Sequence, residues 1–224
     1  APQFSKWVAD EIRPHLGNRV LELGAGIGRM TSQLTPRQIY VASDTDPYAL
    51  QYLKSYKVGK PYLRVLRIDP EASEDFELLR NTFDTILVVN LLERLSHPNQ
   101  ILKNLYGALM PGGKAIFLVP QNPGLHGTLD QFLQTRERYT QEKLESDLSE
   151  AGFKVDRIWQ FNRLGTLPWY VNSKLVKSKQ FSLIQIKLLE IFMPLVRRID
   201  PYLPWPGLNL LAIAKKPNQL IKDN

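Results

Sequence analysis

Residues 20–31, VLELGAGIGRMT, decide the fold that this sequence predicts. The apolar run at 20–23 is typical of a buried strand, and Gly24, Gly26 and Gly28 follow it directly. Glycine allows positive φ angles and a close approach of a ligand to the backbone, while the start of the next helix offers free N–H groups to a polar or anionic ligand. This strand–loop–helix unit predicts a nucleotide-type site at the carboxyl edge of a parallel sheet.

The spacing of the glycines argues against a dinucleotide site. The pattern G-x-G-x-x-G would need glycine at position 29 or 31, where Arg29 and Thr31 stand. The chain instead reads E-L-G-x-G-x-G from Glu22, and Asp44 follows one strand–helix unit later, in YVASDTDP at 40–47. At the tip of a second strand, the Asp44 carboxylate would accept hydrogen bonds from both ribose hydroxyls.

These residues resemble motifs I and II of the class I S-adenosylmethionine (SAM) methyltransferases. Three later segments match that family in order: LRVLRID ending in Asp69, FDTILVVNLLERL at 83–95, and LYGALMPGGKAIFLVP at 105–120. The resemblance covers residues 4–160, and an ordered set is more specific than any single motif. It implies a doubly wound, Rossmann-like α/β fold with a seven-stranded sheet whose last strand is antiparallel. The alternation of apolar runs and helical segments independently predicts a parallel, doubly wound sheet.

The resemblance implies SAM as the cofactor and S-adenosylhomocysteine as its product. It assigns Glu22 to the methionine ammonium, Asp44 to the ribose and Asp69 to the adenine amine. Asn90 and Leu91 would flank the donor methyl with backbone carbonyls. Both aspartates also precede turn-forming residues, so a simple turn is the alternative for each. The expected cofactor-binding residues are Glu22, Gly24, Ala25, Gly26, Gly28, Asp44, Thr45, Asp69, Asn90 and Leu91.

The customary catalytic histidines of related small-molecule methyltransferases are absent. Many members have Glu-His after the fourth strand, whereas this chain has Glu93-Arg94. The segment after the fifth strand resembles a subgroup found beside or fused to glycosyltransferases, but the histidine expected there aligns with Thr135. His126 is therefore the first candidate for the catalytic base, followed by Glu93 and Tyr139. A solvated surface role is the alternative for His126.

Composition narrows the possible partners. The chain of 224 residues has no cysteine and only three scattered histidines, so we expect neither disulfides nor a metal site. Residues 151–224 hold 12 Lys and Arg against 4 Asp and Glu, whereas residues 1–150 hold 17 against 18. This cationic end indicates an anionic partner or a solvated lysine-rich surface. We expect a cytoplasmic protein, because neither a signal segment nor an apolar span of membrane length is evident.

The domain prediction is a single SAM-methyltransferase domain over residues 1–224, with a helical insertion at 165–206 between the sixth and seventh strands. The gap of about 45 residues between these strands is too long for a structureless loop in a compact domain. Three interpretations of the insertion stay open: a cap over the active site, a segment lying on the inner face of a membrane, and a dimer interface. The oligomeric state also stays open.

The function predicted from these features is SAM-dependent methyl transfer to a small-molecule acceptor or a lipid- or sugar-linked one. The alternative is a catalytically weak or inactive SAM-binding module that binds a membrane or a protein partner through the insertion. A nucleic-acid partner is not expected, because enzymes that methylate exocyclic amines of bases carry Asn/Asp-Pro-Pro-aromatic after the fourth strand. Residues 90–93 read Asn-Leu-Leu-Glu instead.

Overall fold

The computed structural model describes residues 2–218, which form a seven-stranded sheet in the order β3-β2-β1-β4-β5-β7-β6. β7 runs antiparallel to both of its neighbours, and the remaining pairs are parallel. This arrangement confirms the predicted doubly wound α/β fold with an antiparallel last strand. The strands are β1 (Arg19–Leu23), β2 (Ile39–Asp44), β3 (Leu63–Arg67), β4 (Phe83–Val89), β5 (Leu109–Pro120), β6 (Lys154–Phe161) and β7 (Asn209–Lys215).

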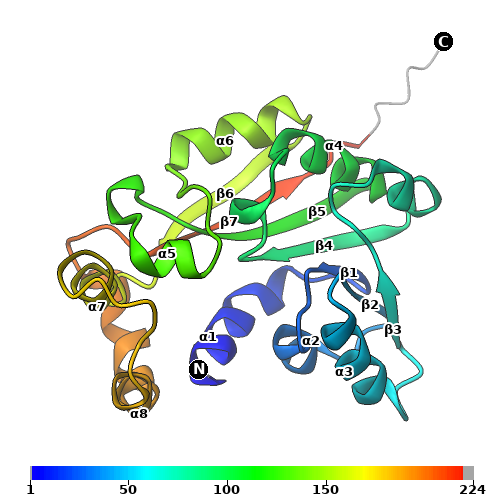
Figure 1. Ribbon diagram of the computed structural model, residues 1–224. Helices are drawn as coiled ribbons and strands as arrows, with labels where there is room; N and C mark the ends of the chain where they lie inside the picture. Colours follow the sequence, from blue (N-terminus) through cyan, green and yellow to red (C-terminus); the bar gives the residue numbers. More distant parts are fainter. Residues whose placement is uncertain (1, 219–224) are drawn as a thin grey trace.

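Helices cover both faces of the sheet, with α1, α2 and α3 on one side and α4 and α6 on the other (Figure 1). Local sequence explains where they start: Asp46 caps α3 by accepting from the Tyr48 N–H, and Thr140 caps α6 by accepting from the Lys143 N–H. The α-helices are α1 (Pro2–Ile12), α2 (Arg29–Leu34), α3 (Pro47–Lys57), α4 (Pro98–Ala108), α5 (Thr128–Phe132), α6 (Gln141–Glu150), α7 (Thr166–Tyr170) and α8 (Leu183–Ile199).

Two apolar cores lie on the two faces of the sheet, because successive strand residues point to opposite sides. On β1, Val20 belongs to the same core as Trp7 of α1 and Leu53 of α3. Its neighbour Leu21 belongs to the other core, with Leu105 of α4 and others. Both cores hold the carboxyl ends of β1 and β4 in fixed positions, and the predicted ligand site lies at these ends.

The connection from β6 to β7 is helical, as its length requires. α7 continues into a π-helical turn at Val171–Leu175, and α8 follows after a short link. Ser182 and Gln185 form a capping box at the start of α8. α8 runs through Pro194 as one helix of 17 residues.

α8 packs on α1 along one stripe only. Met193 and Val196 are buried in the core that contains Trp7, and the Arg197 guanidinium lies 2.8 Å from the Asp10 carboxylate of α1. Leu189 packs half-buried against the same core. Eight further apolar side chains of α8 are at least one-third exposed: Leu183, Ile184, Ile186, Leu188, Ile191, Phe192, Leu195 and Ile199. Within residues 2–218, the structure contains no helix that is both long enough and apolar enough to cross a membrane.

Candidate functional site

A cavity of about 320 Å³ opens at the carboxyl ends of β1 and β4. The glycine loop forms one wall through Gly24 and Gly26, Asn90 forms another, and Ser5 and Val8 of α1 close the side. Of the cofactor-binding residues predicted from the sequence, those that line this cavity are Glu22, Gly24, Ala25, Gly26 and Asn90. Its volume lies in the range of small-molecule sites.

Gly24 shows why this loop excludes side chains. Its φ angle of +71° belongs to the left-handed region, and a Cβ built on it would lie 2.9 Å from the Leu91 Cδ2 atom. Leu91, a predicted cofactor residue, therefore packs against the glycine loop. A larger residue at position 24 would both strain the backbone and push Leu91 out of place.

Asp44 binds the glycine loop to the tip of β2. Its carboxylate accepts hydrogen bonds from the N–H groups of Gly26 at 2.7 Å, Thr45 at 2.8 Å and Asp46 at 2.9 Å. A carboxylate has about four lone-pair positions, so one further donor can still be accepted. The structure thus shows the turn predicted as the alternative role of Asp44, and it leaves capacity for a ribose hydroxyl.

Glu22 is buried beneath the glycine loop. One of its carboxylate oxygens accepts from the Thr31 hydroxyl at 2.5 Å and from the Tyr40 hydroxyl at 2.9 Å. Burial raises the pKa of Glu22 to about 7, and the two hydrogen bonds limit the rise. A cationic ammonium group in the cavity would favour the ionised carboxylate, which suits the predicted partnership with the methionine part of SAM.

Five predicted cofactor residues are not among those that line the 320 Å³ cavity: Asp44 and Leu91, described above, and Gly28, Thr45 and Asp69. The Asp69 carboxylate accepts from the Glu71 N–H at 3.0 Å, in the turn foreseen as its alternative role. Gly28 begins α2 with a φ angle of +78°. Thr45 lines a separate cavity of about 540 Å³ beside α3 and β3. A role for Asp69 at an adenine ring stays a prediction.

Glu93, in the loop after β4, has the properties of a catalytic base. Only 3% of the residue is exposed, and its Oε2 atom has no hydrogen-bond partner among the described residues. Burial raises the pKa of Glu93 to about 7, while the nearby Arg94 and Arg138 act in the opposite direction. A carboxyl group that titrates near neutrality and keeps a free oxygen can accept a proton from a bound acceptor.

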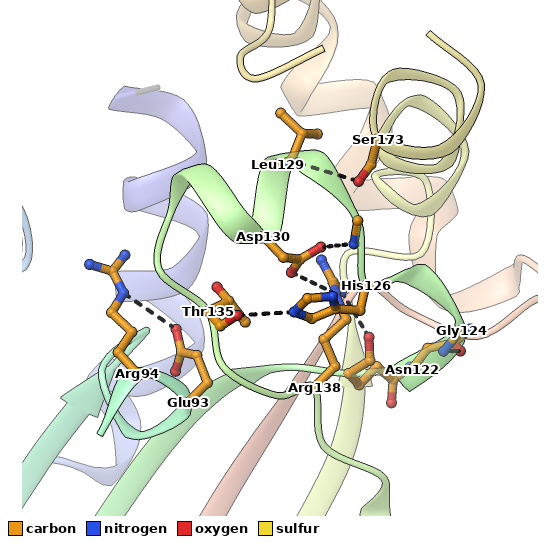
Figure 2. Close-up of polar contacts among 12 residues, drawn as sticks. Glu93, Arg94, Asn122, Gly124, His126, Leu129, Asp130, Thr135, Arg138 and Ser173 are labelled. Carbon is orange, nitrogen blue, oxygen red and sulfur yellow. Dashed lines mark hydrogen bonds and ion pairs between the residues drawn. The ribbon is translucent and has the colours of Figure 1, made fainter. Parts of the chain in front are cut away.

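The other two candidates for the base have less freedom. The His126 Nε2 atom lies 3.0 Å from the backbone carbonyl of Thr135, so this nitrogen donates there and only Nδ1 can accept a proton (Figure 2). Tyr139 is fully buried, and burial raises its pKa, so its hydroxyl stays protonated at neutral pH. Glu93 is thus better placed as a base than His126, the first candidate from the sequence.

A buried ion pair that sequence reasoning missed supports this region. The Arg138 Nε atom lies 2.8 Å from the Asp130 carboxylate, and both side chains are at most 1% exposed. Asp130 also accepts from the Gly127 N–H at 2.9 Å, and Arg138 Nη1 donates to the Gln121 carbonyl at 2.9 Å (Figure 2). Asp130 and Arg138 lie eight residues apart in the sequence, and no spacing pattern showed that they pair.

Residues 21–115 match a protein-family model described as a methyltransferase domain. A tRNA U34 carboxymethyltransferase of Syntrophotalea carbinolica is 28% identical over 182 residues, which are 70% of this chain and 55% of that protein. The tRNA U34 carboxymethyltransferase of Methylococcus capsulatus is 28% identical over 169 residues, covering 68% of this chain and 50% of that protein. The chain thus spans about half the length of these curated relatives.

Solved structures share the fold at low sequence identity. The [4+2]-cyclase SpnF covers 95% of this chain and 82% of its own length, with a TM-score of 0.68 and 16% identity. A methyltransferase in complex with the Haloferax volcanii Trm112 activator covers 96% and 89%, with a TM-score of 0.67 and 14% identity. A SAM-dependent methyltransferase from Archaeoglobus fulgidus covers 96% and 95%, with a TM-score of 0.63 and 16% identity. Because one neighbour is a cyclase, the fold alone does not fix the reaction.

These findings overturn the partners predicted from the sequence. The relatives are named for tRNA modification, and one structural neighbour is bound to a protein activator. The expectation of a small-molecule or lipid-linked acceptor with peripheral membrane contact, and without nucleic acid, was therefore wrong. The missing Asn/Asp-Pro-Pro-aromatic run excludes only methylation of exocyclic amines, and leaves other base positions open. The membrane interpretation came from basic residues that flank an apolar helix in the insertion, and the exposed apolar side chains of α8 suit a protein partner as well.

Proposed function

We propose that this chain, which belongs to the class I SAM-dependent methyltransferases, transfers a methyl group from SAM to RNA of the tRNA class. The choice of SAM as the methyl donor is supported by the cavity that the glycine loop forms. Buried Glu22 lies beneath this loop, and Asp44 holds the edge of the loop. These residues fit SAM, because Glu22 can face an ammonium and Asp44 retains one accepting position.

The choice of RNA as the methyl acceptor is supported by two arginine side chains, Arg94 and Arg136, that lie beside Glu93. The Arg136 N–H donates to the Glu93 carbonyl at 2.9 Å, and the Arg136 side chain donates to the Arg94 carbonyl at 3.0 Å. Both arginines are exposed, so they are available to phosphate groups. The excess of basic residues in the last third of the sequence agrees with an anionic acceptor, and the names of the relatives agree with tRNA.

In this mechanism the chain positions two reactants and accepts one proton. SAM supplies an electrophilic methyl group when it is bound. Asp44 and the glycine loop hold the donor in place, while Arg94 and Arg136 orient the backbone of the acceptor. Glu93 takes a proton from the attacking atom at Oε2, where the structure leaves a free acceptor.

The relatives are named for carboxymethyl transfer, which needs a donor with an extra carboxylate beside the sulfonium. The charged residues that line the donor cavity are Glu22, which is acidic and buried, and Arg29, which is exposed. No buried cation among the described lining residues would balance that carboxylate. We therefore favour SAM as the donor.

The test combines calorimetry with a transfer assay on the purified chain. We expect heat of binding with SAM and S-adenosylhomocysteine, and incorporation of labelled methyl into unmodified transcribed tRNA but not into DNA of the same sequence. The carboxymethyl sulfonium analogue of SAM serves as the competing donor. Absence of donor binding by folded protein contradicts the donor half of the proposal, and absence of transfer to any tRNA contradicts the acceptor half.

Tight donor binding without transfer would favour a second candidate, a SAM-binding module that acts through a protein partner. The exposed apolar side chains of α8 favour this candidate, since such a surface is typical of protein interfaces. The absence of the customary histidines agrees with it too. The transfer assay therefore separates the two candidates directly.

A further inference from the structure

The segment that forms α3 and β3 carries a concentrated positive charge. Residues 47–68 hold five Lys and Arg and no Asp or Glu. The rest of residues 1–150 holds 12 Lys and Arg against 18 Asp and Glu, so this cationic segment belongs to an otherwise acidic part of the chain. A local excess of this kind indicates a place where an anionic partner binds.

Four of the five cations line a groove between α3 and the edge strand β3, which lie side by side (Figure 1). Lys54 and Arg67 line the cavity of about 540 Å³. A second cavity of about 440 Å³ is lined by Lys54, Lys57 and Lys60. The two cavities share Lys54 and Val58, so they adjoin and form one groove, here called the α3–β3 groove. No acidic residue of the described part of the chain lines either cavity.

The cations of the α3–β3 groove are not neutralised by the protein. Among residues 2–218, no carboxylate forms an ion pair with any of the four. Lys60 donates to the Tyr56 carbonyl at 2.6 Å and lies over the Tyr56 ring, whereas Lys54, Lys57 and Arg67 are exposed. An entering anion therefore meets three exposed cations and displaces no protein carboxylate.

Two tyrosines beside the groove are exposed on α3. Tyr48 is 82% exposed and Tyr52 is 57% exposed. They are four residues apart, so both side chains lie on one face of the helix. Exposed aromatic rings stack with nucleobases of any kind, because every base has a π-face. Cations next to such rings are typical of proteins that bind single-stranded nucleic acid.

The groove starts beside the donor cavity. Thr45 lines the 540 Å³ cavity and directly follows Asp44, whose carboxylate accepts from the Gly26 N–H at 2.7 Å. From there the groove follows α3 toward the end of this helix at Lys57. A long acceptor can therefore lie in the groove while one of its nucleotides reaches the donor.

We propose that the α3–β3 groove binds a single-stranded segment of the RNA acceptor. Lys54, Lys57 and Arg67 contact its phosphates, and Tyr48 and Tyr52 stack with its bases. The inference rests on the proposed function, since it gives the RNA acceptor a second contact surface apart from the reacting nucleotide. Because these contacts do not touch the reacting atoms, their loss should raise the KM for tRNA and leave kcat unchanged.

The first test measures the affinity for transcribed tRNA at several salt concentrations, by fluorescence anisotropy in the presence of S-adenosylhomocysteine. Combining Lys54→Gln with Arg67→Gln removes two phosphate contacts. This double variant should bind tRNA about tenfold more weakly than wild type. Its plot of log affinity against log salt concentration should be shallower by about 1–2 units of slope. The KM for tRNA methylation should rise about tenfold as well.

The matched control for this test is Lys103→Gln combined with Arg80→Gln. Lys103 lies on α4, which covers the opposite face of the sheet, and both side chains are exposed. The control variant loses the same charge, so its affinity, salt dependence and KM should stay close to those of wild type. An equal effect of both double variants would mean that only the net charge matters, and would overturn the inference.

The second test separates stacking from attraction between charges. Its probes are a ten-residue oligomer of U and inorganic polyphosphate of the same length. Tyr48→Leu combined with Tyr52→Leu should weaken binding of the U oligomer about tenfold and leave binding of polyphosphate unchanged. If this variant binds the U oligomer as tightly as wild type does, the groove accepts any polyanion, and the assignment to RNA is wrong.

The outcomes keep this inference apart from the proposed function. Wild-type affinity and KM for tRNA in the Lys54→Gln, Arg67→Gln variant would overturn the inference and leave the proposed function standing. If wild type binds tRNA through the groove but methylates none, the proposed function fails and the RNA surface remains. Absence of tRNA binding by wild type overturns both. Circular dichroism checks folding, and loss of S-adenosylhomocysteine binding by the folded variant would assign the groove to the donor and overturn the inference.

Discussion

The backbone N–H of Gly26 donates a 2.7 Å hydrogen bond to the side chain of Asp44, which joins the loop after β1 to the end of β2. Residues 18 positions apart in the sequence thereby form one edge of the donor cavity. The bond fixes the loop against the end of β2 and so holds its backbone in place for binding. Such preorganisation lowers the entropic cost of binding a donor.

Asp44→Ala should weaken S-adenosylhomocysteine binding by about 1.5–3 kcal/mol, since a charge-assisted contact and the support of the loop are both lost. Asp46→Ala is the matched control: Asp46 caps α3, so its loss should cost about 1 kcal/mol of stability and little donor affinity. Calorimetry and chemical denaturation of both variants measure these effects. Equal donor affinity in wild type and Asp44→Ala would remove Asp44 from the site.

Glu22→Gln should flatten the pH dependence of stability. Burial raises the pKa of Glu22 to about 7 from an ordinary value of 4.5. The stability linked to the protonated carboxyl is therefore complete below pH 4.5 and is lost as the pH rises through 7. Between these limits the wild type should lose roughly 3 kcal/mol more unfolding free energy than the variant. Exposed Glu74→Gln is the control, and parallel curves for Glu22→Gln and wild type would contradict the prediction.

Glu93→Gln should reduce kcat/KM for tRNA methylation by about 10²–10⁴-fold while leaving donor affinity unchanged. The pKa of Glu93 is raised to about 7 by burial, and the carboxylate is the basic form. The wild-type rate should therefore increase as pH rises through 7, and this increase should disappear in the variant. A variant that keeps the wild-type pH profile would show that the base is another group.

His126→Gln should lower the same rate by less than about tenfold, because the histidine ring donates to the Thr135 carbonyl and the glutamine amide can replace that donor. Its pH profile should keep the wild-type increase around pH 7. A loss as large as that of Glu93→Gln would return the role of base to His126, the first candidate from the sequence.

Asp130→Asn should destabilise the fold by about 3–5 kcal/mol, since it leaves the buried Arg138 guanidinium without its counter-charge. The control is Asp156→Asn, which removes an ion pair with Lys215 in which both side chains are about 40% exposed. That exposed pair should contribute less than about 1 kcal/mol. Urea denaturation of both variants compares the two pairs, and similar losses would mean that burial of the Asp130–Arg138 pair has no special effect.

Local sequence was sufficient for most of the sheet and for the glycine loop. The run at 20–23 predicted β1 to within one residue, because buried parallel strands read as continuous apolar stretches. Between β3 and β4, Ser73–Leu79 forms a 3₁₀ helix. Only Phe76 is buried there, so no apolar stripe favours a full α-helix.

Long-range side-chain pairings could not be predicted in the same way. Arg138 and Trp169 lie in different elements, and their stacking depends on how α7 folds back over the β5–α6 connection. No periodicity within either element indicates this contact. The free oxygen of Glu93 likewise follows from burial by neighbouring loops, which a sequence motif does not encode.

Helix α1 contacts both the donor cavity and α8. Ser5 and Val8 of α1 line the donor cavity, while Asp10 and the Gln3 N–H hold Arg197 and Glu190 of α8. Displacement of α8 by an arriving partner would consequently be transmitted to the wall of the cofactor pocket. Binding of the cofactor and binding of a partner on α8 would in this way be linked mechanically through one short helix.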